Sequence, residues 1–413
     1  MTSKHTAHII IQAQTPLKVG SNNSDFLQDS PIQKDWNGLP MILGTSITGV
    51  LRKDFDTNKV NDIFGNENGS KIIISNALLL DEKENVNEGL LLQKSNFLKI
   101  FDNLPIREHT AINSKGVTNK GAKFDEEVVF KGTKFKFLIE LIEDDEKTFH
   151  DILDLLASPS FRLGGGSTKG FGKFEIIEIK TTNKECSSSL NNFTGNIYKT
   201  KEVNQKYTTY TLKIKPDDFF MFGSGFGDDQ ADQIPTYEKV VDYNTGKLSD
   251  DMILIPASSI KGAIAHRTAF HYNKEMLKQK KDHTQVGEKN KAVNIIFGHK
   301  KELVDDKKTE LGQKGKILIS DCFKENNETT KVFDHVSIDR FTGGAIDSAL
   351  FNEKIVVDDG EYYKIEILLH KDLDGTDEQK AFESSLTDIT TGTLSLGGAT
   401  TKGHGLFSGS WSK

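Results

Sequence analysis

The chain has 413 residues, of which 36% are hydrophobic, and its formal net charge is -7 at pH 7. This length suggests about two domains, and no apolar run reaches the roughly 18 residues that a membrane-spanning helix needs. The N-terminus lacks the apolar block and cleavage site of a signal peptide, so we expect a cytoplasmic protein with no membrane partner. The acidic balance argues against coating nucleic acid through bulk charge, so any such binding must use a local groove.

Two cysteines, Cys186 and Cys322, lie far apart without a neighbouring CxxC or histidine cluster. Neither a disulfide framework nor a zinc site is therefore predicted, and we interpret both as ordinary thiols.

Hydrophobic periodicity predicts the order strand, helix, strand, strand, helix, strand in each half of the chain. In the first half these elements are residues 8–20, 44–56, 71–80, 133–143, 146–157 and 171–180. In the second half they are residues 210–223, 257–277, 315–323, 361–372, 377–390 and 405–411. This order is typical of a ferredoxin-like (RRM-like) fold, which belongs to the α+β class.

A glycine-rich line near the end of each half shows that the chain is repetitive. The line "LGGGSTKGFGKF" (163–174) returns 233 residues later as "LGGATTKGHGLF" (396–407). Further segments recur in the same order: 42–55 as 255–270, 63–79 as 296–301 and 314–323, and 111–130 as 337–357. We therefore predict two fused copies, 1–195 and 196–413, with the seam in the polar stretch 181–196.

One segment of the second copy, residues 273–292, has no close counterpart in the first copy and contains six lysines. It is either a solvated, flexible insertion or a basic arm that touches RNA.

The glycine lines are candidate phosphate-binding loops. Glycine allows backbone N–H groups to face outward, and Ser167, Thr168 and Lys169 add donors for phosphate oxygens. A flexible turn is the alternative, but a second line with Thr-Lys-Gly in the same place makes a plain linker a poor explanation. Neither line fits GxxxxGK[ST], so a nucleotide-hydrolysing P-loop is not predicted.

The starts of the two first helices also favour anions, because free N–H groups and the positive helix end lie there. Lys261 adds a charge in the second copy, whereas capping alone explains Ser46 and Ser258 equally well. Arg52 and Arg267 lie further along these helices, where a solvated face is the default. Two helix starts and two glycine lines together suggest a long polyanion as the ligand.

Single aromatic and histidine side chains leave two interpretations open. Phe171 can stack on a base or pack under its loop. The histidines His109, His266, His299 and His404 can contact RNA or fill ordinary surface and packing positions.

These residues resemble a known family. The line 163–174 resembles the glycine-rich loop of the RAMP superfamily, the repeat-associated proteins of CRISPR systems. The segment 29–52 is similar to the first helix entry of the backbone subunit of type III CRISPR effector complexes, which act in antiviral defence, and 337–345 resembles another segment of that subunit. With both halves included, the chain looks most like the tandem backbone subunit of the type III-D branch.

The resemblance implies a subunit that lines up along a guide RNA, splays its bases with a β-hairpin thumb, and leaves sequence recognition to pairing with target RNA. It also implies an endoribonuclease that uses a loop aspartate with Mg²⁺ or another divalent cation. That aspartate corresponds to Asp29 before Ser30-Pro31, although an aspartate before proline is also a common turn former. The second copy lacks Asp-Ser-Pro, and among its acids we prefer Asp232. Thr48 replaces the family lysine that Lys261 retains.

The expected site has three parts. Asp29 and Asp232 are the catalytic candidates, and Asp29 is the metal candidate. The RNA-binding candidates are Thr45, Ser46, Arg52, Gly164, Gly165, Gly166, Lys169, Phe171, Ser258, Ser259, Lys261, His266, Arg267, Arg340, Gly397, Gly398, Lys402 and His404.

Two other functions remain open at this point. The first is a non-catalytic guide-RNA scaffold whose cutting is done by other subunits, which the unmatched loop of the second copy favours. The second is a guide-processing endoribonuclease, which commonly uses a histidine near the N-terminus. His5 and His8 lie there, where a tail or strand role is the alternative.

Overall fold

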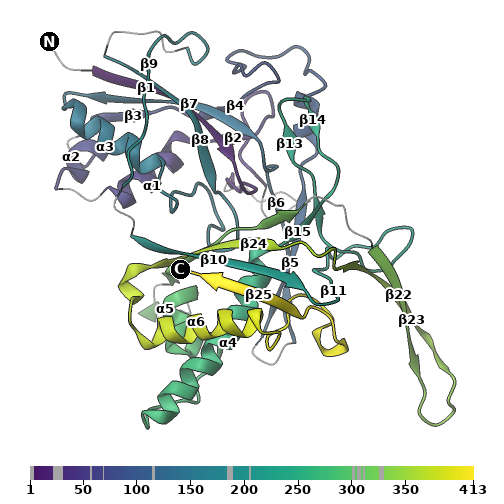
Figure 1. Ribbon diagram of the computed structural model, residues 1–413. Coiled ribbons are helices and arrows are strands. Elements are labelled where there is room, and N and C mark those ends of the chain that lie inside the picture. Colours follow the sequence, from purple (N-terminus) through teal and green to yellow (C-terminus); the bar gives the residue numbers. More distant parts are fainter. Residues whose placement is uncertain are drawn as a thin grey trace.

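The computed structural model describes residues 4–21, 31–55, 58–67, 69–113, 117–183, 189–203, 206–299, 303–304, 308–309, 312–324 and 330–413. The two largest sheets are antiparallel, carry helices packed on one face, and lie one above the other (Figure 1). The predicted mixture of strands and helices is confirmed. None of the described helices combines the length and apolar character that crossing a bilayer requires.

The first sheet is built around β1 (Lys4–Ala13), which pairs with β7 (Lys134–Ile142) and β8 (Phe174–Thr182). The strand order is β2-β4-β7-β1-β8-β9, and β3 pairs with β7 beside β4. The short strands are β2 (Met41–Ile42), β3 (Ile72–Ile74), β4 (Ala77–Leu79) and β9 (Asn196–Ile197). Its helices are α1 (Gly44–Asp54), α2 (Val60–Phe64), η1 (Leu98–Asp102) and α3 (Glu146–Leu156).

The second sheet is built in the same way around β10 (Tyr207–Pro216). It pairs with β24 (Tyr363–His370) and β25 (Phe407–Ser412), and the order is β20-β24-β10-β25 with β20 at Ile317–Ile319. The helices are α4 (Ala257–Lys278), η2 (Gly287–Lys289), α5 (Lys291–Phe297), η4 (Lys371–Leu373), α6 (Asp377–Thr390) and η5 (Thr400–Lys402).

Each sheet has its own hydrophobic core. The first core takes its buried side chains from Ala7 to Ile179, and the second from Tyr210 to Phe407. Val241 is the exception, because it lies beyond the first copy in sequence yet belongs to the first core. A segment of the second half therefore packs into the core of the first sheet.

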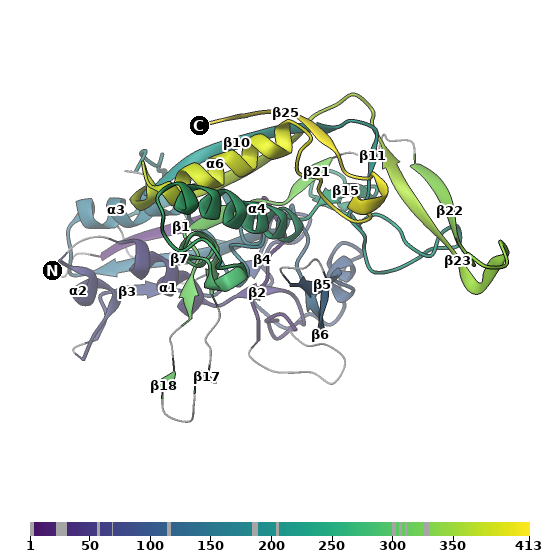
Figure 2. The same cartoon turned by 90° about the horizontal axis from the view of Figure 1, so that it is seen from below.

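Two β-hairpins leave the lobes. The first consists of β5 (Ile106–Ile112) and β6 (Thr118–Glu127), and the second of β22 (Thr330–Ile338) and β23 (Ala345–Val357). Figures 1 and 2 show the second hairpin projecting away from the body of the molecule. The short strands of this half are β11 (Phe219–Phe220), β12 (Tyr237–Glu238), β13 (Val241–Asp242), β14 (Lys247–Leu248), β15 (Met252–Ile255), β16 (Gly298–His299), β17 (Leu303–Val304), β18 (Lys308–Thr309), β19 (Gln313–Lys314) and β21 (Cys322–Lys324).

Two elements differ from their predicted extents. The strand expected over residues 8–20 begins at Lys4 and ends at Ala13, because the chain beyond it leaves the sheet and Leu17 bridges to Val129. The lysine-rich segment 273–292 is partly a continuation of α4, which runs to Lys278, and it ends where α5 begins.

Candidate nucleic-acid interface

Both glycine lines are ordered turns held by matching backbone hydrogen bonds. The N–H of Gly165 donates to the Lys18 carbonyl at 2.7 Å, and the N–H of Gly398 donates to the Met221 carbonyl at 2.7 Å. The residue before each donor, Gly164 or Gly397, has a positive φ of 83° or 94°, and a Cβ there would collide with the same carbonyl. Only glycine fits at these two positions, so the repeated glycines are explained by close backbone approach.

Each line places its lysine over an aromatic ring at the base of a hairpin. The Lys169 Nζ lies 5.0 Å from the centre of the Phe124 ring, and the Lys402 Nζ lies 4.5 Å from that of Phe351. A histidine stacks on each ring, His109 at 5.2 Å and His335 at 4.9 Å between ring centres.

A buried glutamate completes each hairpin base, with different partners in the two copies. Glu126 contacts the Lys18 Nζ at 2.5 Å, and its other carboxylate oxygen lies 3.1 Å from the His109 Nε2. Burial alone would raise the pKa of Glu126, but the contacts with His109 and Lys18 lower it to about 2. In the second copy Glu353 lies 2.6 Å from the His335 Nε2 and 3.5 Å from the His404 Nε2.

Two predicted RNA contacts are buried. The Phe171 ring is fully covered, with the Arg107 guanidinium over its face at 4.9 Å, so the packing role that the sequence left open is the one observed. His404 takes the corresponding position in the second copy and is 2% exposed. Burial lowers the pKa of His404, which favours the neutral imidazole.

The first backbone N–H groups of α1 and α4 are bound by side chains that are distant in sequence, not by the serine or threonine hydroxyls at the helix starts. The cap positions are Leu43 and Pro256, and neither Ser46 nor Ser258 serves as the capping side chain. Instead the Asn76 side chain accepts from the Gly44 N–H at 2.9 Å.

The Asp321 carboxylate accepts from the Ala257 N–H at 2.8 Å in the same manner. The capping explanation for the two serines is thus wrong, because residues from a following strand connection supply the acceptors. Thr45 and Ser259 are exposed at these helix starts.

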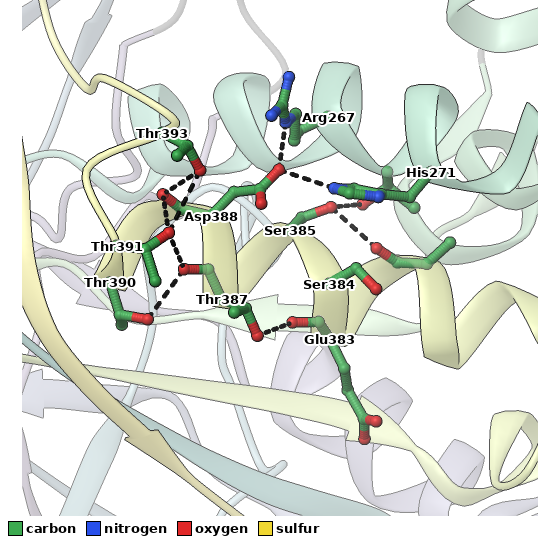
Figure 3. A network of polar contacts seen from close by, with 12 residues as sticks. Arg267, His271, Glu383, Ser384, Ser385, Thr387, Asp388, Thr390, Thr391 and Thr393 are labelled. Carbon is green, nitrogen blue, oxygen red and sulfur yellow. Dashed lines mark hydrogen bonds and ion pairs between the residues drawn. The ribbon is translucent and has the colours of Figure 1, made fainter. Parts of the chain in front are cut away.

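The helix cations differ in availability. Arg52 is exposed and donates to Asn61, whereas Arg267 is bound by Asp388, which also contacts the His271 Nε2 at 2.7 Å (Figure 3). His266 lies exposed on α4. Arg340 lies exposed in the turn of the second hairpin, far along the chain from these helices. The structure therefore does not gather all predicted cations into one patch.

It does bring the first glycine line onto the start of the second copy's first helix. The Lys261 Nζ donates to the Thr168 hydroxyl at 3.1 Å, and a Cβ at Gly170 would collide with Asp321 and Ala257. Burial, and then the neighbouring positive charge of Lys169, lower the pKa of Lys261 to about 8. An anion bound beside these two lysines would relieve their repulsion.

Buried ion pairs hold this junction. Arg107 at the base of the first hairpin binds Asp321 at 2.6 Å and also Glu238. Arg162 donates to the Ser320 hydroxyl at 2.9 Å. These partners come from both copies, so one copy's hairpin base and glycine line form the contact surface for the other.

The catalytic candidates lie in segments of equal length between two matching backbone hydrogen bonds. Asp29 lies outside the described residues, but the backbone pair Ser21–Pro31 that flanks it matches the pair Ser224–Ile234 in the second copy. Ser21 and Ser224 are separated in sequence by the same number of residues as Pro31 and Ile234. The same separation relates Asp29 to Asp232, so the two aspartates occupy equivalent positions.

Asp232 is exposed beside the second hairpin. Its carboxylate accepts from the Asn352 N–H at 3.0 Å, and its own N–H donates to the Asn352 side chain at 2.7 Å. Asn352 precedes Glu353, so this loop meets the hairpin beside the glutamate that contacts His335 of the hairpin and His404 of the glycine line. The neighbouring Asp228 is paired with Lys354 instead.

Metal binding has limited support among the described residues, where no group of three or more His, Cys, Asp or Glu side chains is placed to hold an ion. The metal candidate, Asp29, lies outside the described residues.

Sequence reasoning missed the hairpin-base residues Phe124, Glu126, Phe351 and Glu353. Their signal was present as "FDEEVV" and "FNEKIVV" inside the repeated segments, where Phe-x-Glu occurs at matching positions. Arg107 was also missed, because its partners lie in the other copy.

The family model of the RAMP superfamily matches residues 10–175 and 221–408, and the chain therefore belongs to the RAMP superfamily. No curated protein matches the chain. A similar solved chain comes from the cryo-EM structure of the Type III-B Cmr-beta bound to cognate target RNA, with 18% identity and a TM-score of 0.33. The match covers 44% of this chain and 61% of that chain, less than two thirds of its length.

Proposed function

We propose that the chain is a guide-RNA-binding backbone subunit of a type III CRISPR effector complex that also cleaves complementary target RNA. The observation that carries the proposal is the glycine line and hairpin base that recur in both halves of a RAMP-superfamily chain. Its partners would be guide RNA, target RNA and other subunits of the complex, and its place would be the cytoplasm.

We further propose two ferredoxin-like RAMP domains, residues 1–195 and 196–413, each with one hairpin as its thumb. The support is the common strand order, in which the opening strand lies between the strand before the last helix and the strand after the glycine line. That order is the one expected for the strand, helix, strand, strand, helix, strand arrangement.

RNA backbone binding is supported by the charge arrangement at the junction. Lys169 and Lys261 lie near each other beside Thr168, and burial of Lys261 makes an unshared positive charge costly there. Hydroxyl and ammonium groups of this kind donate hydrogen bonds to phosphate oxygens. The net charge of -7 leaves such local clusters as the route to a polyanion.

Cleavage would proceed by attack of a 2′-hydroxyl on the adjacent phosphorus. The carboxylate of Asp29 or Asp232 accepts the hydroxyl proton, the phosphorus–5′-oxygen bond breaks, and the departing oxygen takes a proton from water. The products are a 2′,3′-cyclic phosphate and a 5′-hydroxyl. Mg²⁺ held by this carboxylate and the RNA phosphate would supply charge stabilisation when bound.

The test is a denaturing-gel assay of end-labelled RNA complementary to the guide, with the assembled complex and Mg²⁺ or a chelator. We expect Asp29→Ala and Asp232→Ala each to remove one distinct product while target binding is retained. Asp229→Ala is the matched control. Asp229 lies in the same loop as Asp232, but its position does not align with that of Asp29. Unchanged products with both variants would contradict the nuclease proposal.

A non-catalytic scaffold is the second candidate, and one observation favours it for the second copy. The Asp232 carboxylate already accepts a hydrogen bond from the Asn352 N–H, so one of its oxygens is engaged by the protein itself. Loss of a product with Asp29→Ala alone would make the second copy a binding module.

The two histidines that the guide-processing alternative would use are buried in a strand. His5 and His8 lie in β1 and are 7% and 3% exposed, and His8 stacks on Phe193 at 3.7 Å between ring centres. Incubating the protein alone with unprocessed repeat RNA should therefore give no cleavage.

A further inference from the structure

The two glycine-line lysines are oriented by aromatic rings, and this arrangement is formed twice. Lys169 lies over Phe124 and Lys402 over Phe351, and the stacked histidine makes an interplanar angle of 22° with the ring in both copies. The residues around the two lysines differ between the copies. The Met221 position corresponds to Lys18, and the His404 position to Phe171.

An aromatic ring face holds an ammonium group in place but does not neutralise its charge. The ring quadrupole attracts the cation, but the three N–H donors and the net positive charge stay available to a further partner. A carboxylate in the same place would neutralise the lysine. The ring is therefore suited to presenting a lysine to a polyanion.

We propose that Phe124 and Phe351 are positioning residues that hold Lys169 and Lys402 for contact with the RNA backbone, with Lys402 making the stronger contact. This inference rests on the proposed RNA-binding function. It adds two residues that act through the lysines rather than touching RNA themselves.

The two copies differ in how much of the lysine charge is free. The Lys169 Nζ lies 3.7 Å from a carboxylate oxygen of Glu126, so part of its charge is shared. Within the part of the chain that the structure describes, Lys402 makes no ion pair with a carboxylate, and its side chain is exposed. Glu353 is instead engaged by His335 and His404.

The experiment measures binding of a single-stranded RNA oligonucleotide to the full chain at several salt concentrations. Lys402→Met should weaken binding and reduce the slope of log affinity against log salt by about 0.7, the value for one phosphate contact on a single strand. Phe351→Leu should weaken binding about 2- to 5-fold, the change that an exposed cation–π contact makes.

Phe351→Tyr separates positioning from packing. Tyrosine keeps the ring face and should restore binding, whereas leucine keeps only apolar volume; thermal midpoints of both variants show whether the fold is intact. Two outcomes would overturn the positioning role and leave the proposed function standing. One is that Phe351→Leu and Phe351→Tyr weaken RNA binding equally. The other is that Phe351→Leu leaves RNA binding unchanged while Lys402→Met weakens it. No effect of Lys402→Met would instead contradict RNA binding at this line.

The first copy is the matched control. Phe124→Leu should weaken binding less than Phe351→Leu, because Lys169 shares its charge with Glu126. A larger effect in the first copy would contradict the assignment of the stronger contact to Lys402.

Discussion

Arg107 shows what a single residue contributes at the junction of the two copies. Its side chain is 6% exposed, and it binds Glu238 and Asp321 from the second copy while lying over Phe171. Burial alone would lower the pKa of Arg107, but the two carboxylate charges raise it. The charge is therefore retained in the interior because both partners are present.

Replacing Arg107 should be strongly destabilising. Arg107→Met leaves two buried carboxylates without their counter-charge, a loss of about 3–5 kcal/mol in the free energy of unfolding. Chemical denaturation measures it, with Lys94→Met as the control, because the ion pair of Lys94 with Asp102 is on the surface and should matter little. A loss below about 1 kcal/mol would mean that the junction relaxes around the missing charge.

His8 makes the stability of the first lobe depend on pH. Burial, and then the charge of Lys136, lower the pKa of His8 from 6.5 to about 4. The folded state holds the neutral imidazole, so the stabilisation is present above pH 6.5 and is lost as the pH falls from 6.5 towards 4.

We expect unfolding at pH 5 to cost about 2 kcal/mol less than at pH 7 on account of His8. His8→Phe keeps the stacking on Phe193 and removes the titration, so its urea midpoint should depend less on pH over this interval. Identical pH dependence in both proteins would show that other groups carry it.

At the scale of elements, the two first helices are begun by the same device. Asn76 and Asp321 follow the next strand of their copies and bind the first N–H groups of α1 and α4. Such acceptors do the work of a capping residue although they are distant in sequence.

Asn76→Ala should destabilise the first lobe by about 1 kcal/mol, the usual cost of losing a cap. Asp321→Ala should cost more, because Asp321 also binds Arg107. Denaturant unfolding of both variants gives the ranking, and Ser46→Ala, which removes no cap, should stay close to wild type. Equal losses for Asn76→Ala and Ser46→Ala would contradict this capping scheme.

At the scale of the whole molecule, the first glycine line does two things at once. It leads into β8 of the first copy, and Gly170 within it packs on Asp321 and Ala257 of the second. The corresponding Gly403 has a similar positive φ and nothing within 4 Å of where a Cβ would lie. Substituting Gly170 therefore tests both the contact between copies and the backbone strain, whereas substituting Gly403 tests the strain alone.

Gly170→Ala should loosen the junction, whereas Gly403→Ala should show only the strain of a non-glycine residue at positive φ. Calorimetry should resolve two thermal transitions for Gly170→Ala and one for Gly403→Ala, because the two cores are otherwise separate. Identical melting curves would mean that the other junction contacts suffice.

The sequence predicted much of the architecture because its signals are local or repeated. Period-two and helical patterns located the central strands and principal helices, and the recurrence of the glycine lines indicated duplication. Ser46 and Ser258 were left between capping and anion binding, and Phe171 between stacking and packing, because these roles depend on what lies opposite in space.

By itself, then, the sequence determined the alternation of elements, the repeat and the family signature, since short-range patterning and backbone constraints at glycine are written in neighbouring residues. Only the tertiary structure decided that Lys169 meets Phe124, that Lys261 meets Thr168, and that Arg107 is buried between copies. These contacts join positions far apart in the chain, and their energies come from burial and charge pairing that arise only when the two copies pack together.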